Sequence, residues 1–252
     1  MHDELTYRLV KPKAALTDFV ESFWCLENHS DSGKEIIVVP DGRVDLFVSH
    51  SKAEGFHITL SGLESEAECV IFEGKTLIFA ISFKLPAIES VFRQSISSLL
   101  NDISVLPTDF WGFGEDDLSD FDAFCDKATA ILSEILGDTP IDPRKQKLFN
   151  LIYSSHGELS VKELAERVNW SERQINRYFN EQFGISLKSY ATILRFRASF
   201  SHIREGKLFP EQNFADQAHF IREVKKFSGV TPKDLHKNTN DRFIQFSTLP
   251  RK

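Results

Sequence analysis

The sequence has little of several residue types and patterns that mark specialised classes of protein. It contains three cysteines among 252 residues, and Cys25, Cys69 and Cys125 are too far apart for the paired spacing of a zinc site. An odd number of separated cysteines favours reduced thiols over a disulfide framework. No run of 18 apolar residues is present, which argues against a membrane-spanning helix. The N-terminus lacks the basic start and apolar core of a signal peptide. These absences predict a cytoplasmic protein without a membrane partner.

Arrangements of catalytic or metal-binding residues are also missing. His50 and His57 form the only closely spaced histidine pair, and they lack the His-x-His cluster and following Glu of metal-binding β-barrels. No Ser/His/Asp or Cys/His arrangement, phosphate loop or carboxylate pair stands out by its spacing. We therefore predict that the protein is not an enzyme and needs no cofactor or metal. The cysteines are better explained as buried small side chains than as redox sensors.

Positive charge is scarce overall but concentrated in one half of the chain. The 30 Lys and Arg stand against 37 Asp and Glu, giving a formal net charge of −7, which by itself argues against nucleic-acid binding. Residues 143–252 nevertheless hold 20 basic and 11 acidic residues, a net charge of +9, whereas residues 1–142 carry −16. Halves of opposite sign indicate one part that neutralises phosphates and another part with a separate role.

Within the basic half, residues 159–184 predict two short helices with a tight corner between them. Asn169 and Trp170 interrupt the apolar spacing of the first helix, and Asn tolerates the left-handed conformation of a corner. Ser171 followed by Gln174 is a capping box that begins the second helix, and Gly184 is a suitable residue to end it. The second helix turns one face outward, which carries Arg173, Asn176, Arg177 and Asn180.

Two interpretations of this corner are open. Helix-turn-helix proteins present Arg and Asn to base edges in the major groove from such a helix. Antiparallel helix pairs are also common in other proteins, where outward Arg and Asn simply meet water. The charge of this half and an internal repeat favour the first interpretation.

The repeat lies 45 residues further on, where Arg177 corresponds to Arg222 and Gly184 to Gly229. Residues 216–232 therefore look like a second copy of the reading helix. Its predicted DNA-binding residues are Gln217, Arg222, Lys225 and Lys226. His219 is interpreted equally well as a packed or capping histidine or as a DNA contact. Pro210 falls where the first unit has Ala165, inside the supporting helix. Because Pro costs ~3 kcal/mol in a helix interior, we expect that helix to be shortened or lost. The gap would be filled by Leu208, Phe209 and Phe214.

Residues 145–240 resemble the DNA-binding domain of the AraC/XylS-type transcriptional regulators. The matching pieces are SVKELAERVNWSERQINRYFNEQFGIS, the linker helix at residues 190–204, and NFADQAHFIREVKKFSGVTPKDL. The resemblance implies two helix-turn-helix subdomains, promoter binding and control of transcription. In the first half, the PDGRVDLFV block and the strands after it resemble an N-terminal domain that accompanies some of these regulators. That resemblance implies a sensing or regulatory domain.

The first half predicts a β-rich domain. Strands are expected on both sides of a turn at residues 40–42 and over residues 57–61, 67–72 and 77–83. Helices are expected after Pro12, over 87–103 and over 121–136. The apolar stripe of the last helix could pack on the strands or pair with a second copy of the chain. Asp45, on an apolar strand, would need Arg43 or backbone donors if it is buried.

The predicted fold class is α+β: a β-rich N-terminal domain followed by an all-α C-terminal domain with two helix-turn-helix units, the second with a shortened first helix. The predicted boundaries are 1–137 for an acidic regulatory domain that ends in a helix, 138–146 for a linker, 147–240 for the DNA-binding domain and 241–252 for a tail. The predicted function is sequence-specific transcriptional regulation. Expected partners are promoter DNA, RNA polymerase, a small-molecule effector of unknown identity and a second copy of the chain. The alternative is a protein-interaction or ligand-sensing regulator whose incomplete second unit has lost strong DNA binding.

Overall fold

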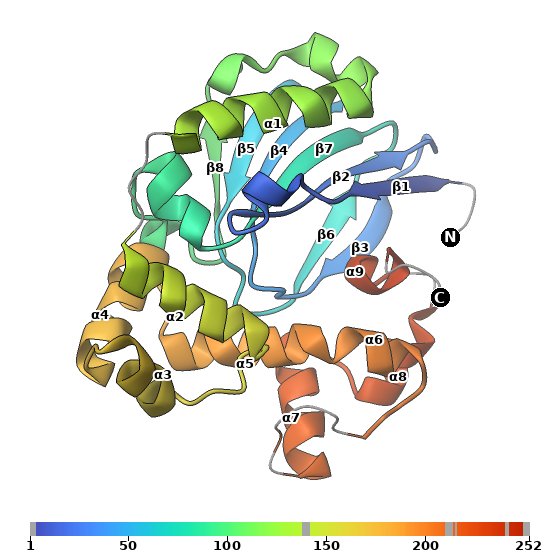
Figure 1. Ribbon diagram of the computed structural model, residues 1–252. Coiled ribbons are helices and arrows are strands. Elements are labelled where there is room, and N and C mark those ends of the chain that lie inside the picture. The colour runs from blue at the N-terminus through green and yellow to red at the C-terminus, as the bar shows by residue number, and fades with distance from the viewer. Residues whose placement is uncertain (1–3, 138–141, 210–213, 215, 240–241, 249–252) are drawn as a thin grey trace. The chain divides into compact units, whose positions relative to one another are not determined.

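The protein is described by a computed structural model, which places residues 4–137, 142–209, 214, 216–239 and 242–248 (Figure 1). The chain divides into two compact units. The first comprises Met1–Lys34, Arg43–Gly62 and Ile71–Ile141, and the second comprises Glu35–Gly42, Leu63–Val70 and Asp142–Lys252. Two short segments from the N-terminal half of the sequence thus belong to the helical unit. Across these placed ranges, no helix is long and apolar enough to cross a membrane.

The first unit is built on a six-stranded antiparallel sheet. Its strand order is β1 (Leu5–Val10), β2 (Val20–Asn28), β7 (Leu77–Phe83), β4 (Val44–Ser51), β5 (Gly55–Ser61) and β8 (Ile103–Leu106). Side chains alternate between the two faces of each strand, and one face is covered by helix α1 (Phe121–Gly137) (Figure 1). The ring of Phe79 lies 5.1 Å from that of Phe121 and 5.4 Å from that of Phe124.

Helix α1 buries its apolar stripe inside this unit. Phe121, Phe124, Cys125, Ala128 and Leu132 are its buried residues, which supports packing on the strands over pairing with a second copy. Burial raises the pKa of the Cys125 thiol to about 12 and also raises that of Cys25. Both thiols therefore stay protonated and unreactive near neutral pH. Cys69 is exposed.

Two helices predicted in the first half are wrong. Residues 87–103 form a π-helical turn at Ile88–Phe92, a 3-10 turn at Ser97–Leu99 and the start of strand β8. The helix is broken where Arg93 adopts a left-handed conformation with φ of 55° and where the Ser95 hydroxyl accepts the Ser97 amide, an alternative to helical bonding. After Pro12 only a 3-10 turn, Ala14–Leu16, precedes β2.

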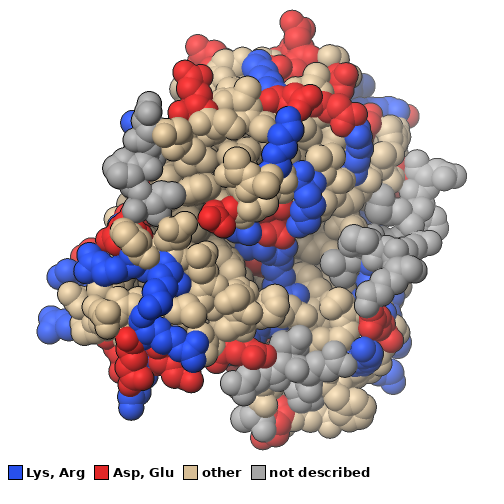
Figure 2. Space-filling view, viewed as in Figure 1, with Lys and Arg blue, Asp and Glu red and all other residues tan. Residues whose placement is uncertain are grey.

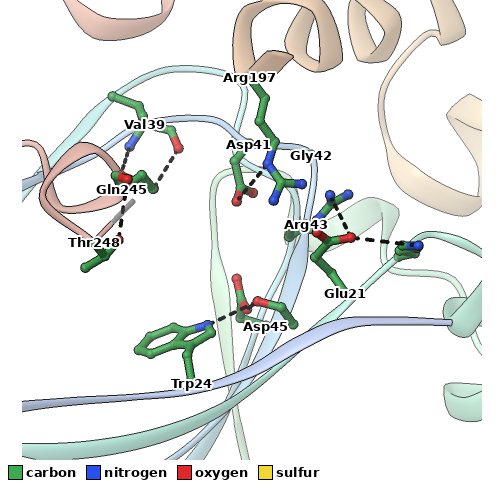
Figure 3. Close-up of polar contacts among 12 residues, drawn as sticks. Glu21, Trp24, Val39, Asp41, Gly42, Arg43, Asp45, Arg197, Gln245 and Thr248 are labelled. Carbon is green, nitrogen blue, oxygen red and sulfur yellow. Dashed lines mark hydrogen bonds and ion pairs between the residues drawn. The ribbon is translucent and has the colours of Figure 1, made fainter. Parts of the chain in front are cut away.

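The turn at residues 40–42 does not join a hairpin. Strand β3 (Lys34–Val38) pairs with β6 (Glu68–Phe72) in a separate two-stranded sheet, whereas β4 lies between β7 and β5. Arg43 and Asp45 each have a further partner in the first unit. Arg43 Nη2 lies 3.2 Å from Glu21 Oε2, and the Asp45 carboxylate accepts from the hydroxyl of Ser82, which in turn accepts from the indole N–H of Trp24 at 3.1 Å (Figure 3).

The Glu21 and Arg43 pair is set in a crowded polar site of the first unit. Burial alone would raise the pKa of Glu21, but the attraction of Arg43, Lys11 and Lys84 outweighs it, and the pKa is lowered. Burial lowers the pKa of the Lys84 ammonium, since its neighbour Glu21 only partly offsets the loss of solvent. Glu21 thus stays ionised and holds Arg43 at the end of the 40–42 turn.

The second unit is mainly helical. Its helices are α2 (Pro143–Ser154), α3 (Val161–Val168), α4 (Glu172–Phe183), α5 (Leu187–Ala198), α6 (Phe200–Arg204), α7 (Gln217–Ser228), α8 (Pro232–Lys237) and α9 (Ile244–Ser247). Helix α2 begins at Pro143 with Asp142 as its N-cap, so the predicted linker, 138–146, is too long at its C-terminal end. The first part of that linker, 138–141, lies outside the described residues.

The expected linker helix is divided between α5 and α6, and Gly206, with φ of 79°, follows the end of α6. Between α6 and α7 the structure describes residues 205–209, 214 and 216, and none of them is helical. The described part of the predicted supporting helix, residues 206–209, is therefore not helical. Pro210, which motivated the prediction of a shortened helix, lies outside the described residues.

Candidate nucleic-acid interface

Helices α3 and α4 form the tight corner that the sequence predicts. The side chains of Ser160 and Ser171 each accept a hydrogen bond from the backbone N–H three residues on, at Glu163 and Gln174. The side chains of Glu163 and Gln174 in turn accept the backbone N–H of Ser160 and Ser171. Asn169 turns the corner with φ of 55°. Gly184 closes α4 with φ of 73°. These caps satisfy amides that would otherwise be unpaired at the helix starts and so fix both ends of the reading helix.

A cluster of aromatic rings holds α4 from beneath. Phe179 and Phe183 are fully buried, and their ring centroids are 5.2 Å apart. Phe149 of α2 lies 6.0 Å from Phe179, and Tyr190 of α5 lies 5.8 Å from it. Rings at these separations pack edge to face or tilted, which fixes the orientation of α4.

The outward face of α4 carries the predicted base-reading residues. Arg173, Arg177 and Asn180 are exposed and Asn176 is half-exposed. The guanidinium of Arg177 lies 3.9 Å from Glu181 Oε1, with both side chains largely exposed, and such a pair contributes little. The Nδ2 groups of Asn176 and Asn180 donate to main-chain carbonyls one turn back, at 3.1 and 2.7 Å. Both amides would have to exchange these bonds to read a base.

Figure 2 shows blue Lys and Arg side chains at the left of the view, over helices α2 and α4, with red acidic side chains below them, near α3. The top of the β-rich unit carries both red and blue side chains. The basic side chains of the helical region include Arg144 and Lys145 at the start of α2. Arg144 lies over the Trp170 ring at 5.4 Å and Lys145 over the Tyr178 ring at 4.7 Å. The N-terminal end of α2 thus adds positive charge beside the corner.

Helix α7 is the second predicted reading helix. Asp216 caps it by accepting the His219 amide at 2.7 Å, and Gly229 ends it with φ of 73°. The predicted DNA-binding side chains of Gln217, Arg222, Lys225 and Lys226 are exposed. The His219 ring packs against Phe214 at 5.7 Å, and its Nε2 lies 3.7 Å from Glu223 Oε1. The packing interpretation of this histidine is thus supported.

The prediction that three apolar residues replace the lost helix is only partly right. Phe214 is buried and packs 5.1 Å from the Phe220 ring. Phe209 is 65% exposed, and Leu208 is half-buried. The predicted filling of the gap is therefore wrong for Phe209, because its ring faces solvent.

A half-buried arginine, Arg195, contacts the loop before α3 and lies within electrostatic reach of Glu223 on α7. Arg195 of α5 donates from Nη1 to the carbonyl of Gly157 at 2.7 Å and from Nη2 to Thr192 Oγ1 at 3.1 Å. Burial lowers its pKa, and the charge of Glu223 on α7 acts in the opposite direction. Arg195 thus points inward, and its role is structural. Its signal in the sequence is the spacing from Tyr190 and Leu194, which places it on the buried side of α5.

Metal ligation has no support in the part of the chain that the structure describes, since no group of three or more His, Cys, Asp or Glu side chains gathers there. The arrangement instead offers two capped helices whose outward side chains are hydrogen-bond donors and cations.

The chain matches two known protein families. Residues 164–238 match a family described as "Helix-turn-helix domain", and residues 8–104 match a "Domain of unknown function (DUF6597)". The helix-turn-helix match falls within the C-terminal region in which the sequence predicts such a domain. A β-rich region precedes this helical region, which confirms the predicted fold class.

Solved structures with some likeness to the chain include two proteins. The C-terminal domain of AraT, a response regulator from Geobacillus stearothermophilus, is 20% identical over 40% of this chain and 88% of that chain, with a TM-score of 0.36. ToxT from Vibrio cholerae O395 is 12% identical over 94% of this chain and 99% of that chain, with a TM-score of 0.43. Unsaturated-fatty-acid-bound ToxT from Vibrio cholerae strain SCE256 is 11% identical over 95% of this chain and 96% of that chain, with a TM-score of 0.42. No curated protein matches the sequence.

Proposed function

We propose that the protein is a sequence-specific DNA-binding transcriptional regulator that reads the major groove mainly with α4. The observation that carries this proposal is the outward face of α4, where Arg and Asn donors project from a helix capped at both ends and seated on buried rings. That face lies within the region that matches a helix-turn-helix family. A rigid support matters because base readout depends on the angle at which a helix enters the groove.

The residue types define what α4 would recognise. Arg173 and Arg177 can each donate two hydrogen bonds to a guanine, and Asn176 and Asn180 can pair with adenine, at ~1–3 kcal/mol of discrimination for each good bidentate contact. Helix α7 offers fewer base-reading donors, Gln217 and Arg222. Its Lys225 and Lys226 suit phosphates, which carry no sequence information. Specificity should therefore reside mainly in α4.

We assign a regulatory role to the β-rich unit, in line with its own six-stranded sheet and the acidic composition of the N-terminal half. Control by a small-molecule effector or by dimerisation, and a contact with RNA polymerase, stay predictions from the family resemblance. Promoter binding would place the protein in the cytoplasm. The competing function, a protein-interaction or ligand-sensing regulator, predicts no strong sequence-dependent DNA binding.

Selection from a pool of random DNA duplexes by the full-length chain tests the proposal without knowledge of the operator. We expect a recurrent motif, and affinity for it should fall steeply as salt rises, because binding releases counterions from the phosphates. Arg177→Ala should reduce the preference for the motif by ~1–3 kcal/mol, the value of a lost bidentate contact, and leave salt-sensitive binding. Lys52→Ala, an equal charge change at an exposed position in the other unit, serves as the control. Failure to enrich any motif at low salt would support the competing function.

A further inference from the structure

Residues 35–42 come from the N-terminal half of the sequence but belong to the helical unit. Helix α9 holds the main chain of this segment. Gln245 of α9 accepts the Val39 amide at 3.2 Å and donates to the Val39 carbonyl at 2.9 Å (Figure 3). The Ile37 amide donates to the Arg242 carbonyl at 2.6 Å, and Ile37 forms a parallel β-bridge with Phe243. These contacts fix the segment in register along the start of α9.

The turn that ends this segment lies on α5. Tyr190 donates its hydroxyl to the Gly42 carbonyl at 3.1 Å, and the Tyr153 hydroxyl is 3.0 Å from that of Tyr190. Gly42 has φ of 76°, and a side chain there would lie 3.2 Å from the Tyr190 ring and 3.1 Å from a Leu194 methyl group. Arg197 Nε lies 4.0 Å from the Asp41 carboxylate (Figure 3). Residues 190, 194 and 197 share one face of α5.

The same contacts reach the helices on which DNA reading depends. The Tyr190 ring packs against Phe179 beneath α4. Phe246 of α9 lies 4.5 Å from Phe200 of α6, and Phe200 is 4.9 Å from Phe196. Phe196 in turn stacks on Phe227 of α7 at 5.3 Å. A continuous series of rings therefore runs from α9 to the second reading helix.

We propose that residues 35–42 together with α9, here called the brace, support α7, whose connection to α6 contains no helix among its described residues, and that DNA reading by α7 requires the brace. This inference rests on the proposed DNA-binding function. The brace contacts α5 at Tyr190, which packs against the inward-facing Phe179, and the outward residues of α4 are exposed. It therefore supports the reading helices without covering the residues that would meet DNA.

A matched pair of glycine substitutions in the full-length chain tests this role. Gly42→Ala and Gly55→Ala impose a similar left-handed strain, since their φ values are 76° and 70°. A Cβ at Gly42 meets α5, whereas a Cβ at Gly55, in the β-rich unit, has nothing within 4 Å. Gln245→Ala provides a second variant that removes the clamp on Val39 without strain in the turn.

Two measurements separate the brace from the proposed function. Hydrogen exchange reports local opening, and we expect faster exchange in α7 for Gly42→Ala and Gln245→Ala but not for Gly55→Ala. On DNA, the same two variants should lose about tenfold in specific affinity, which is 1.4 kcal/mol, and their footprint should shrink to the groove segment read by α4.

The proposed role of the brace would be overturned if Gly42→Ala and Gln245→Ala gave the same hydrogen exchange and the same footprint as Gly55→Ala. Faster exchange of α7 with no DNA preference even in the wild-type chain would contradict the proposed function while leaving the structural role of the brace intact. Faster exchange with an unchanged footprint would show that α7 does not read DNA through the brace. Were Gly42→Ala not to fold, Gln245→Ala would still decide among these outcomes.

Discussion

The two helix-turn-helix units of the chain present reading helices of equal length on very different supports. Helix α4 follows a complete supporting helix, begins with a reciprocal capping box and rests on the rings of Phe149, Phe179 and Phe183. Helix α7 begins with a one-sided cap from Asp216, and no helix is found among the described residues of the connection before it. Its support comes from rings of α5, α6 and α9. The second unit thus keeps the capped helix of the repeat, while rings of α5 and α6 pack against it.

The largest contrast in stability is expected between substitutions at two glycines, one in each helix-turn-helix unit. Gly157, with φ of 74°, precedes the first corner, and a Cβ there would clash with the carbonyl oxygen of Ala191. Gly229, with φ of 73°, has open space around it. We expect Gly157→Ala to lower the free energy of unfolding by roughly 3 kcal/mol or more, as for other steric lesions in cores. Gly229→Ala should cost only the left-handed strain, about 1–2 kcal/mol.

Urea unfolding of both variants measures these costs, provided that the slope of the transition is unchanged. Equal destabilisation by the two substitutions would show that α5 does not fix the first corner as tightly as the geometry indicates.

The next contrast is between the two arginines that correspond across the repeat. Arg177→Ala should reduce discrimination between the selected motif and a shuffled duplex by ~1–3 kcal/mol, the value of a lost bidentate contact. Arg222→Ala should do less, because α7 offers fewer base-reading donors. Competition binding with both duplexes measures the effect, with Lys52→Ala as the control for loss of charge. A larger loss from Arg222→Ala would reverse our ranking of the two helices.

Removal of the N-caps should have a smaller effect that still separates the units. Ser171→Ala and Asp216→Ala should each cost about 1 kcal/mol of stability, the usual value of a cap. Because the described residues between α6 and α7 include no helix, the start of α7 should fray more. We therefore expect hydrogen exchange in the first turn to rise more for Asp216→Ala. Equal increases in both helices would mean that α7 is as well supported as α4.

The smallest effect on DNA binding is expected at Glu181. The corresponding residue of the second unit, 45 positions later, is Lys226. Glu181→Gln removes an acidic group 3.9 Å from Arg177 and one negative charge from the face proposed to meet DNA. We expect DNA affinity to rise by at most ~0.5 kcal/mol, the scale of an exposed ion pair, and more at low salt. Titrations at two salt concentrations check the sign, and weaker binding would give Glu181 a positive role in orienting Arg177.

Local signals explain what the sequence predicts well. Strand β7 has the predicted limits, and the caps at Ser171, Gly184, Asp216 and Gly229 lie where the pattern places them. Each of these features depends on a few neighbouring residues and on backbone preferences that hold in any fold. The outward face of α4 follows from the same helical spacing.

Other features depend on contacts between distant residues and carry no local signal. Strand β8 pairs with residues 58–61 of β5 at the edge of the six-stranded sheet. The turn at residues 40–42 has the composition of a hairpin turn, yet β3 leaves to pair with β6. The pairing of Val39 with Gln245 joins residues 206 positions apart, which no periodic pattern can indicate.

The most direct test of the central claim compares binding of the full-length chain, with and without Arg177→Ala, to the selected motif and to its shuffled counterpart over a series of salt concentrations. We expect the wild-type chain to prefer the motif by about 10³-fold or more, with a steep loss of affinity as salt rises. The variant should bind the motif more weakly and lose ~1–3 kcal/mol of this preference, the value of one bidentate contact. Equal binding of motif and shuffled DNA by the wild-type chain, or an unchanged preference in Arg177→Ala, would contradict the assignment of α4 as the reading helix.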